Sequence, residues 1–355
     1  MANKRVTLAD VAAAAGVAPA TASLVLADRG FELRISEAAQ IKVRQAASLL
    51  GYRPNAVSQG LRTGTTSTIG FISDNIATSQ LAGNTIKGAL EAARSQGFML
   101  FIAETDGDAA TELATIHAMM DRQVDGIILA TMFTRYHEPP AIVDEGIPTI
   151  LLNNLPNSRR PLDAVVPDEI TAGWTAADYM IEAGHQKIHL LGAGPLPSDV
   201  PPDSIAAVQR LQGIQERLSA EGLVPLSYHP MPDWIPVNGR AAMEAVLAQD
   251  PFPEAIICFN DRVALGAYQV LQEHGLRIPD DVSVVSFDDF DIAGWMRPGL
   301  TTIAIPHRAM GRMAVELLLA RIRDIGGSDQ SPGAVHRVPM PLHVRESVRG
   351  QNDDI

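Results

Sequence analysis

The chain has 355 residues, enough for about two or three domains that each bury a core of their own. Its 28 basic and 41 acidic residues leave a net charge of −13, which excludes indiscriminate binding to nucleic acid. A single cysteine excludes a disulfide framework, and Cys258 lies in an apolar run where a buried strand residue is expected rather than a nucleophile or metal ligand.

The charges are divided unevenly along the chain. Residues 1–64 hold eight basic and four acidic side chains, a net charge of +4, so the other residues, with 20 basic and 37 acidic side chains, carry −17. This division confines attraction for phosphate to the N-terminal part, as in a sequence-specific regulator with a separate sensing domain. The sequence contains no secretory segment and no apolar run of the roughly 18 residues that cross a bilayer, which predicts a cytoplasmic protein.

The first 26 residues are expected to form two short helices joined by a glycine turn. Thr7 and Asp10 form a capping box at the start of the first helix. Apolar side chains then follow one helical face, Gly16 supplies the turn, and a second apolar stripe runs from Val17 to Val25. This pattern is typical of a DNA-binding helix-turn-helix, and an alanine-rich helical hairpin without a ligand is the alternative.

A third helix and a linker complete this region. Ser36 and Gly51 mark the start and the end of the helix. The linker runs from Tyr52 to Gly64, and its segment from Asn55 to Arg62 can form a short helix. Because a segment of about eight residues that contains Gly60 is too short to stay helical alone in water, we expect it to be disordered in free protein and helical only on DNA. A plain flexible tether is the alternative.

From Ser67 onward, short apolar strands alternate with helices in two series. The first series has expected strands at 68–72, 99–103, 126–130 and 148–152 and helices at 86–97 and 111–122. The second has helices at 172–184, 205–221, 238–249 and 262–274 and strands at 187–191, 255–259 and 282–286. This alternation predicts parallel sheets covered on both faces, hence two lobes and a cleft beyond the carboxyl ends of the strands.

Seven short motifs add a more specific signal. They are Thr7 to Ala12, Leu50 to Asn55, Val124 to Ile128, Ala183 to His185, Phe259 to Asp261, Ile278 to Val285 and Arg297 to Thr302. In these motifs and their order, over nearly its whole length, the chain resembles the lactose and galactose repressor (LacI/GalR) family of bacterial transcription regulators. The resemblance implies a homodimer that binds double-stranded operator DNA and a two-lobed sensor whose small-molecule ligand changes the affinity for DNA.

The expected fold is an N-terminal all-α helix-turn-helix domain followed by an α/β two-lobed periplasmic-binding-protein-like domain with parallel sheets. The expected boundaries are 1–52 for the DNA-binding domain, 53–66 for the hinge helix or linker, 67–345 for the sensor and 346–355 for a tail. The first lobe is expected at about 67–165 with a segment near 303–330, and the second at about 166–302 with 331–345. Because the tail after Val344 has no sustained heptad, we expect a dimer that does not form a tetramer.

The resemblance also implies a set of effector-binding residues in the cleft, most of them near strand ends. They are Asp74, Asn153, Arg210, Trp234, Asn260, Asp288 and His307. Carboxylates and amides accept hydrogen bonds from vicinal hydroxyls, an arginine fork donates them, and an indole covers the apolar face of a sugar ring, so the set suits a sugar or polyol. Helix capping by Asn260 and Asp288, and a surface-loop position for Trp234, are the alternatives.

The DNA contacts implied by the resemblance lie in the helix-turn-helix and the linker. They are Thr7, Pro19, Ala20, Thr21, Ser23, Leu24, Asn55, Ser58 and Leu61. Pro19, Ala20 and Leu24 offer only apolar contact, so direct readout of base edges is sparse. Leu61 stands at the family's wedge position, where it would insert into a base step of the minor groove.

Enzyme functions lack support in the sequence. Pro197 stands where the dinucleotide fingerprint begun at Gly192 requires glycine, and no Gly-rich loop carries a Walker lysine. The nine histidines are scattered without a metal-ligand spacing, so no catalytic residue, cofactor or metal is expected. The predicted function is an effector-responsive DNA-binding regulator, most often a repressor, of carbohydrate-related genes. A sugar-binding protein whose head has lost operator specificity is the alternative.

Overall fold

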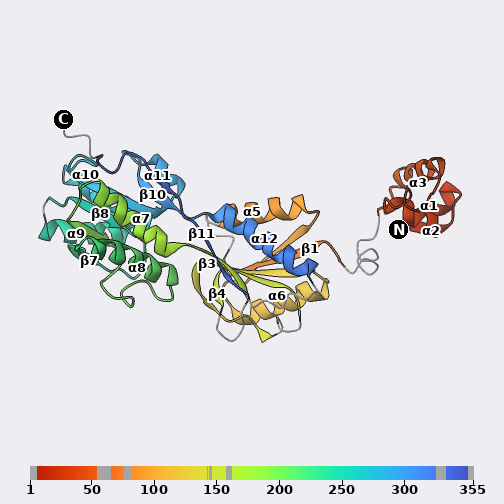
Figure 1. Ribbon diagram of the computed structural model, residues 1–355, viewed down its shortest axis with the longest axis horizontal. Helices are drawn as coiled ribbons and strands as arrows, with labels where there is room; N and C mark the ends of the chain where they lie inside the picture. Colours follow the sequence, from red (N-terminus) through yellow and green to blue (C-terminus); the bar gives the residue numbers. More distant parts are fainter. Residues whose placement is uncertain are drawn as a thin grey trace. The chain divides into compact units, whose positions relative to one another are not determined.

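The computed structural model describes residues 6–53, 65–75, 82–141, 143, 146–156, 162–250, 252–324 and 333–350. The chain divides into two compact units, Met1–Ser67 and Thr68–Ile355 (Figure 1). Among the described residues no single helix is long and apolar enough to cross a membrane, and only the bent pair Leu8–Ala15 and Pro19–Leu26 passes such a test when its members are taken together.

The described part of the first unit contains three helices around a small core: α1 (Leu8–Ala15), α2 (Pro19–Leu26) and α3 (Glu37–Leu49). The expected capping box begins α1, because Thr7 Oγ1 accepts a hydrogen bond from the Asp10 N–H while the Asp10 carboxylate accepts one from the Thr7 N–H. Gly16 ends α1 with φ 67°, a left-handed conformation that turns the chain into α2. All three helices contribute core side chains: Val11, Ala12, Ala15, Ala22, Val25, Val43, Ala46 and Ala47.

The first sheet of the second unit has the strand order β11-β5-β4-β3-β1-β2, and every neighbouring pair is parallel. Its strands are β1 (Thr68–Ser73), β2 (Met99–Glu104), β3 (Gly126–His137), β4 (Thr149–Pro156), β5 (Asp163–Pro167) and β11 (Val335–Val338). Helices α5 (Ala82–Ser95) and α12 (His307–Arg323) cover one face and α6 (Ala109–Asp121) covers the other (Figure 1). Successive β1 side chains alternate accordingly, since Phe71 packs with α5 and α12 while Ile72 packs with α6.

The second sheet has the strand order β12-β10-β9-β8-β6-β7. Its strands are β6 (Ile188–Leu191), β7 (Ser227–His229), β8 (Ala255–Cys258), β9 (Ser283–Asp288), β10 (Thr301–Ala304) and the antiparallel β12 (Leu342–His343). The helices are α7 (Glu169–Glu182), α8 (Ile205–Ala220), α9 (Pro236–Gln249), α10 (Asp261–Glu273) and α11 (Asp291–Trp295). The pair α7 and α8 covers one face and the pair α9 and α10 the other, which gives the predicted architecture of helices on both faces of mainly parallel sheets.

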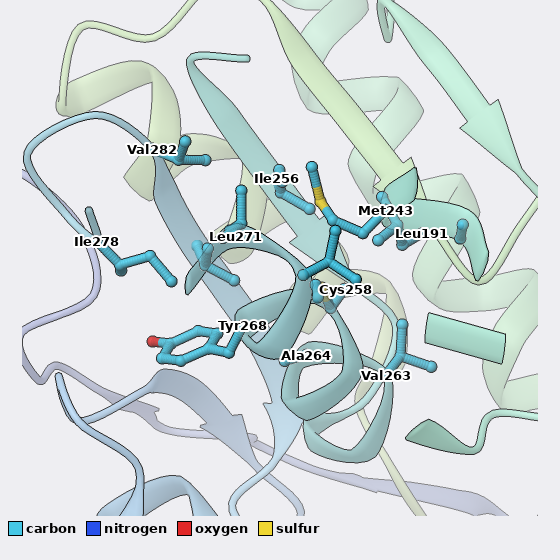
Figure 2. Close-up of a cluster of buried hydrophobic side chains, with 14 of the residues drawn as sticks. Leu191, Met243, Ile256, Cys258, Val263, Ala264, Tyr268, Leu271, Ile278 and Val282 are labelled. Carbon is cyan, nitrogen blue, oxygen red and sulfur yellow. The ribbon is translucent and has the colours of Figure 1, made fainter. Parts of the chain in front are cut away.

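Cys258 is a buried strand residue, as expected. It lies at the end of β8 among apolar side chains of β6, α9 and α10, including Leu191, Met243 and Val263 (Figure 2). Burial raises the pKa of its thiol, so the group stays protonated and unreactive.

Pairs of glycines bring helices into backbone contact in both lobes. A Cβ atom on Gly173 of α7 would lie 2.1 Å from the Arg210 carbonyl oxygen of α8, and one on Gly213 of α8 would lie 2.0 Å from the Ile170 carbonyl oxygen of α7. The same reciprocal arrangement joins α5 to α12 and α9 to α10, through Gly88 with Gly311 and Gly239 with Gly266. Because a side chain at these positions would collide with backbone, only glycine permits this spacing.

The C-terminal part of the chain departs from the expected lobe boundaries. Residues 331–345 were expected in the second lobe, yet β11 pairs in parallel with β5 of the first sheet, from Val335 beside Ala164 to Val338 beside Pro167. The expected tail at 346–355 is also partly wrong, because Ser347 is buried and its hydroxyl donates to the Val284 carbonyl oxygen at 2.6 Å. The described chain therefore crosses between the lobes near residues 168, 305 and 340.

Candidate functional site

A cavity of about 410 Å³ lies between the two lobes of the second unit, a size suited to a small-molecule ligand. The strands β5 and β9 end at this cavity and Asn260 follows β8 there, as the general rule for ligand sites in open α/β sheets predicts. Its walls include Met132, Phe133, Thr134, Arg135 and Asn153 from the first lobe and Glu169, Arg210, Trp234, Asn260, Arg262 and Asp288 from the second.

Arg210 forms a bidentate ion pair inside the second lobe. Its Nε and Nη2 atoms donate to the two carboxylate oxygens of Glu169 at 2.8 and 2.9 Å, and Nη1 donates to the Phe259 carbonyl oxygen. Both Arg210 and Glu169 are 1% exposed. Burial disfavours the charged guanidinium, but the carboxylates of Glu169 and Asp288 outweigh that effect and raise the pKa of Arg210. The fork of donors expected to face a ligand is therefore already engaged by Glu169.

Asp288 ends β9 with its side chain at the cavity. Its φ of 104° lies in the left-handed region, and its side chain is 11% exposed. The Arg210 Nη2 atom lies 3.8 Å from Asp288 Oδ1, beyond hydrogen-bond distance. Burial raises the pKa of Asp288 well above its usual value, Arg210 partly opposes this, and the nearby Asp261 carboxylate adds to it.

Asp261 lies directly behind these groups. Its carboxylate accepts hydrogen bonds from Thr302 Oγ1 and from the Phe290 N–H, both at 2.7 Å. Burial nevertheless raises the pKa of Asp261 to about 6. Acidic side chains thus both line this part of the cavity, with Asp288, and stand behind it, with Asp261.

Trp234 and Asn260 are joined to each other at the wall of the second lobe. The indole N–H of Trp234 donates to the Gly192 carbonyl oxygen at 2.9 Å, which fixes the ring beside Phe259 with centroids 5.6 Å apart. Asn260 caps α10, because its Oδ1 accepts from the Val263 N–H at 2.8 Å, while its Nδ2 donates to the Trp234 carbonyl oxygen at 3.2 Å. Asn260 therefore caps a helix, as the alternative held, and also lines the cavity.

In the first lobe, Asn153 lines the cavity and Asp74 stands behind its wall. Asn153 Oδ1 accepts from Thr134 Oγ1 at 2.6 Å. Asp74 forms an ion pair with Arg135 at 3.0 Å and accepts a hydrogen bond from the Met132 N–H at 3.1 Å. Asp74 is not among the residues that line the cavity, so it positions the end of β3, which forms part of that wall.

His307 lies in a second, smaller cavity inside the first lobe. This cavity has a volume of about 20 Å³, room for little more than a water molecule, and shares Met132 and Asn153 with the larger one. His307 Nδ1 lies 3.2 Å from Thr85 Oγ1, and its Nε2 is buried without a hydrogen-bond partner among the described residues. Burial lowers the pKa of His307 to about 4, so the ring is neutral at pH 7.

Glu169 and the end of β3 were not expected from the sequence. Glu169 follows β5, a strand that was not expected, and its partner Arg210 lies 41 residues further along the chain. β3 was expected to end at Ala130 but continues to His137, with a register shift after Ala130. No group of His, Cys, Asp and Glu side chains suited to a metal ion occurs in the described ranges.

The candidate DNA-binding residues fall into three groups. Pro19 and Ala20 are exposed at the start of α2, whereas Thr21, Ser23 and Leu24 are half-buried along it. Thr7 is exposed, but its hydroxyl belongs to the capping box of α1. Asn55, Ser58 and Leu61 lie outside the described residues.

The charged side chains of the first unit are partly paired. Arg29 and Arg44 form ion pairs with Glu32 and Asp28. Arg34, Lys42 and Arg53 form no ion pair within residues 6–53, so their charges are available to a phosphate backbone.

Comparisons with known families match both units. The family model described as "Bacterial regulatory proteins, lacI family" matches residues 7–55, and the model "Periplasmic binding protein-like domain" matches residues 177–348.

Full-length relatives agree with these matches. The HTH-type transcriptional repressor PurR of Vibrio parahaemolyticus is 32% identical over 325 residues, which cover 90% of this chain and 92% of that protein. The ribose operon repressor of Escherichia coli is 30% identical, covering 89% of this chain and 93% of the relative. A crystal structure of the lac repressor dimer bound to operator and the anti-inducer ONPF superposes with a TM-score of 0.77 at 25% identity, covering 97% of this chain and 99% of that one.

Proposed function

We propose that a sugar-like or polyol effector in the 410 Å³ cavity controls the affinity of this protein for operator DNA. The premise is that the chain belongs to the lacI family of bacterial regulatory proteins and is a DNA-binding transcription repressor. The observation that carries the proposal is the set of groups at that cavity, which joins the polar side chains of Asn153, Asn260 and Asp288 to the indole of Trp234. A polyhydroxylated ring needs both kinds of surface. Its relatives are transcriptional repressors rather than enzymes, and the genes we assign to its control are carbohydrate-related.

The two lobes can transmit the binding of a ligand to the N-terminal DNA-binding heads. A ligand that contacts Asn153 on one lobe and Asp288 on the other favours one spacing of the lobes over another. The chain acts as a homodimer, so a change in that spacing moves the two N-terminal heads that must reach both half-sites of an operator together. We assign the protein to the cytoplasm, where operator DNA is found.

A second candidate function, a sugar-binding protein whose head has lost operator specificity, is favoured by one observation. The α2 sequence, Pro19 to Leu26, contains no charged side chain and no amide, the groups that read base edges best. Readout by DNA shape and by apolar contact with thymine methyl groups is the alternative basis of specificity.

Footprinting separates the two functions. The full-length protein is incubated with DNA flanking its gene, with and without members of a thermal-shift panel of sugars, polyols and nucleosides. We expect a protected, near-palindromic site whose occupancy changes with the panel members that raise the melting temperature. A panel member that binds while no DNA site is protected at any concentration would establish the second function instead.

A further inference from the structure

The cavity carries more negative charge than its arginines neutralise. Arg210 faces three buried carboxyl groups, those of Glu169, Asp288 and Asp261, and its hydrogen-bonding fork is taken by Glu169. With all four groups ionised, this cluster has a net charge of −2. A buried cluster of this kind is costly, because low-dielectric surroundings strengthen the repulsion between its carboxylates.

The other charged residues at the cavity do not neutralise this negative charge. Arg135 is paired with Asp74, and the exposed Arg262 shares its wall with two exposed acidic residues, Asp203 and Asp233. The residues that line the cavity thus include four acidic and three basic side chains. A ligand entering from solvent therefore meets an anionic cleft.

Asp288 is the group of this cluster that remains open to a ligand. Within the described residues no hydrogen bond reaches its carboxylate, whereas the carboxylates of Glu169 and Asp261 both accept hydrogen bonds from their neighbours. Its side chain is 89% removed from solvent and lines the cavity. A buried carboxylate without a hydrogen-bond partner is unfavourable, and a donor on the ligand would relieve that cost.

We propose that the effector is a hydroxylated molecule bearing a positively charged amine, an amino sugar or a related amino polyol, whose ammonium group pairs with Asp288. This inference rests on the proposed function and adds the charge of the ligand to it. An ammonium group supplies the missing donors and, with all four groups ionised, lowers the net charge of the buried cluster from −2 to −1.

The aromatic walls suit the same ligand. Trp234 lines the cavity with its N–H turned to Gly192, and the Arg210 guanidinium lies 5.6 Å from the indole centroid. Indole faces attract cations within about 6 Å. Anionic ligands such as sugar phosphates and sugar acids would face repulsion from Glu169 and Asp288, because the buried Arg210 fork is already engaged by Glu169.

Matched ligands that differ at one group test the charge of the effector. Isothermal titration of the full-length protein at pH 7 compares glucosamine, galactosamine and mannosamine with the parent sugars, their N-acetyl forms and their 6-phosphates. We expect at least one amine to bind ten times more tightly, or better, than its parent sugar and its N-acetyl form, and the phosphates to bind weakest. The proposal is overturned if no amine shows that preference, including the case in which no amine binds.

Two variants test whether Asp288 is the residue that pairs with the ammonium group. Asp288→Asn should reduce the affinity for the amine by about ten- to a hundredfold and abolish its preference over the neutral sugar. The matched control Asp291→Asn, an exposed aspartate at the start of α11 outside the cavity, should leave both affinities unchanged. An amine preference that survives in Asp288→Asn would contradict the assignment of its partner.

Operator binding distinguishes failure of this inference from failure of the proposed function. Footprinting of the same protein samples without ligand reports the DNA-binding function alone. A footprint that persists while neutral sugars bind best and release it would refute the amine and retain the effector-controlled repressor. The melting temperature of each variant is also recorded. An unchanged melting temperature of Asp288→Asn shows that its loss of amine affinity is not caused by unfolding.

Discussion

At the scale of single residues, the ion pair of Arg210 and Glu169 dominates the energetics of the cleft. Replacing Arg210 by Met leaves the Glu169 carboxylate buried and unpaired, so we expect the free energy of unfolding to fall by about 3–5 kcal/mol. The control Arg277→Met breaks a pair with Asp281 at the surface, where solvent screens the charges, and should cost far less. Urea denaturation of the full chain measures both.

The double variant Glu169→Gln with Arg210→Met completes this test. Since it removes both charges, it should lose less stability than the sum of the two single variants. Strictly additive losses would mean that the two residues contribute independently.

His307 provides a pH-dependent contribution to stability. The unfolded chain binds a proton at this ring near pH 6.5, whereas the folded chain does so only near pH 4 because the ring is buried. The folded state is therefore favoured fully above pH 6.5, and up to about 3 kcal/mol is lost as the pH falls to 4.

His307→Gln should flatten that dependence. Denaturation midpoints between pH 4 and 7 should fall less steeply in His307→Gln than in the parent, while the exposed His117→Gln on α6 serves as control. Equal slopes in all three proteins would contradict the buried, neutral state of His307.

The sequence could identify several residues near the site but not how they are connected. Trp234, Asn260, Asp288 and Arg210 were found through motif resemblance, and all four lie at the cavity. Glu169 was missed because the pairing of two side chains 41 residues apart depends on helix packing, which no local pattern encodes.

At the scale of elements, most apolar runs predicted strands well, whereas the short β5 and the mixed sequences did not. β3 continues beyond Ala130 because its polar residues find partners in β4, where Thr131 Oγ1 donates to Asn154 Oδ1 at 2.7 Å. Such cross-strand pairing is not visible in the sequence of one strand. The short edge strand β7 was missed for a related reason, since three half-buried residues carry no periodic signal.

Backbone contact between α7 and α8 sets the position of the buried ion pair. Gly173→Ala would bring a methyl group onto the Arg210 carbonyl oxygen and force the helices apart. We expect a loss of about 1–3 kcal/mol in the free energy of unfolding, together with weaker ligand binding. Gly83→Ala, at an open helical position of α5, should be neutral or stabilising in the same denaturation assay. Equal effects of the two substitutions would contradict close packing as the cause.

The linker helix remains a prediction, because Asn55 to Arg62 lie outside the described residues. Gly60→Ala should favour the helix by about 1 kcal/mol, so operator binding should tighten and the response to ligand should weaken. Leu61→Ala should reduce DNA bending, as gel mobility of permuted fragments reports. If both variants bind and bend DNA like the parent, the segment acts only as a tether.

At the scale of the whole molecule, charge separates the two functions along the chain. The head has a net charge of +4 and the rest −17, so operator affinity should fall steeply between about 50 and 200 mM salt. Changing Arg34, Lys42 and Arg53 together to Gln should flatten the plot of log affinity against log salt by about 1 for each lost phosphate contact.

A matched triple variant checks where that salt dependence resides. Arg277, Arg312 and Arg323 are exposed arginines of the second unit, and their replacement by Gln should leave the slope unchanged. A fall in slope equal to that of the head variant would show that the second unit also contacts phosphate.

The reciprocal glycines also bear on how such a regulator can evolve. Helices that contact each other through backbone atoms keep their spacing when the side chains that face the cleft are changed. Substitutions among the lining residues can then accumulate without displacing the scaffold that holds them. A gene duplicate could thus acquire a new effector by changing a few cleft positions while inheriting its allosteric framework intact.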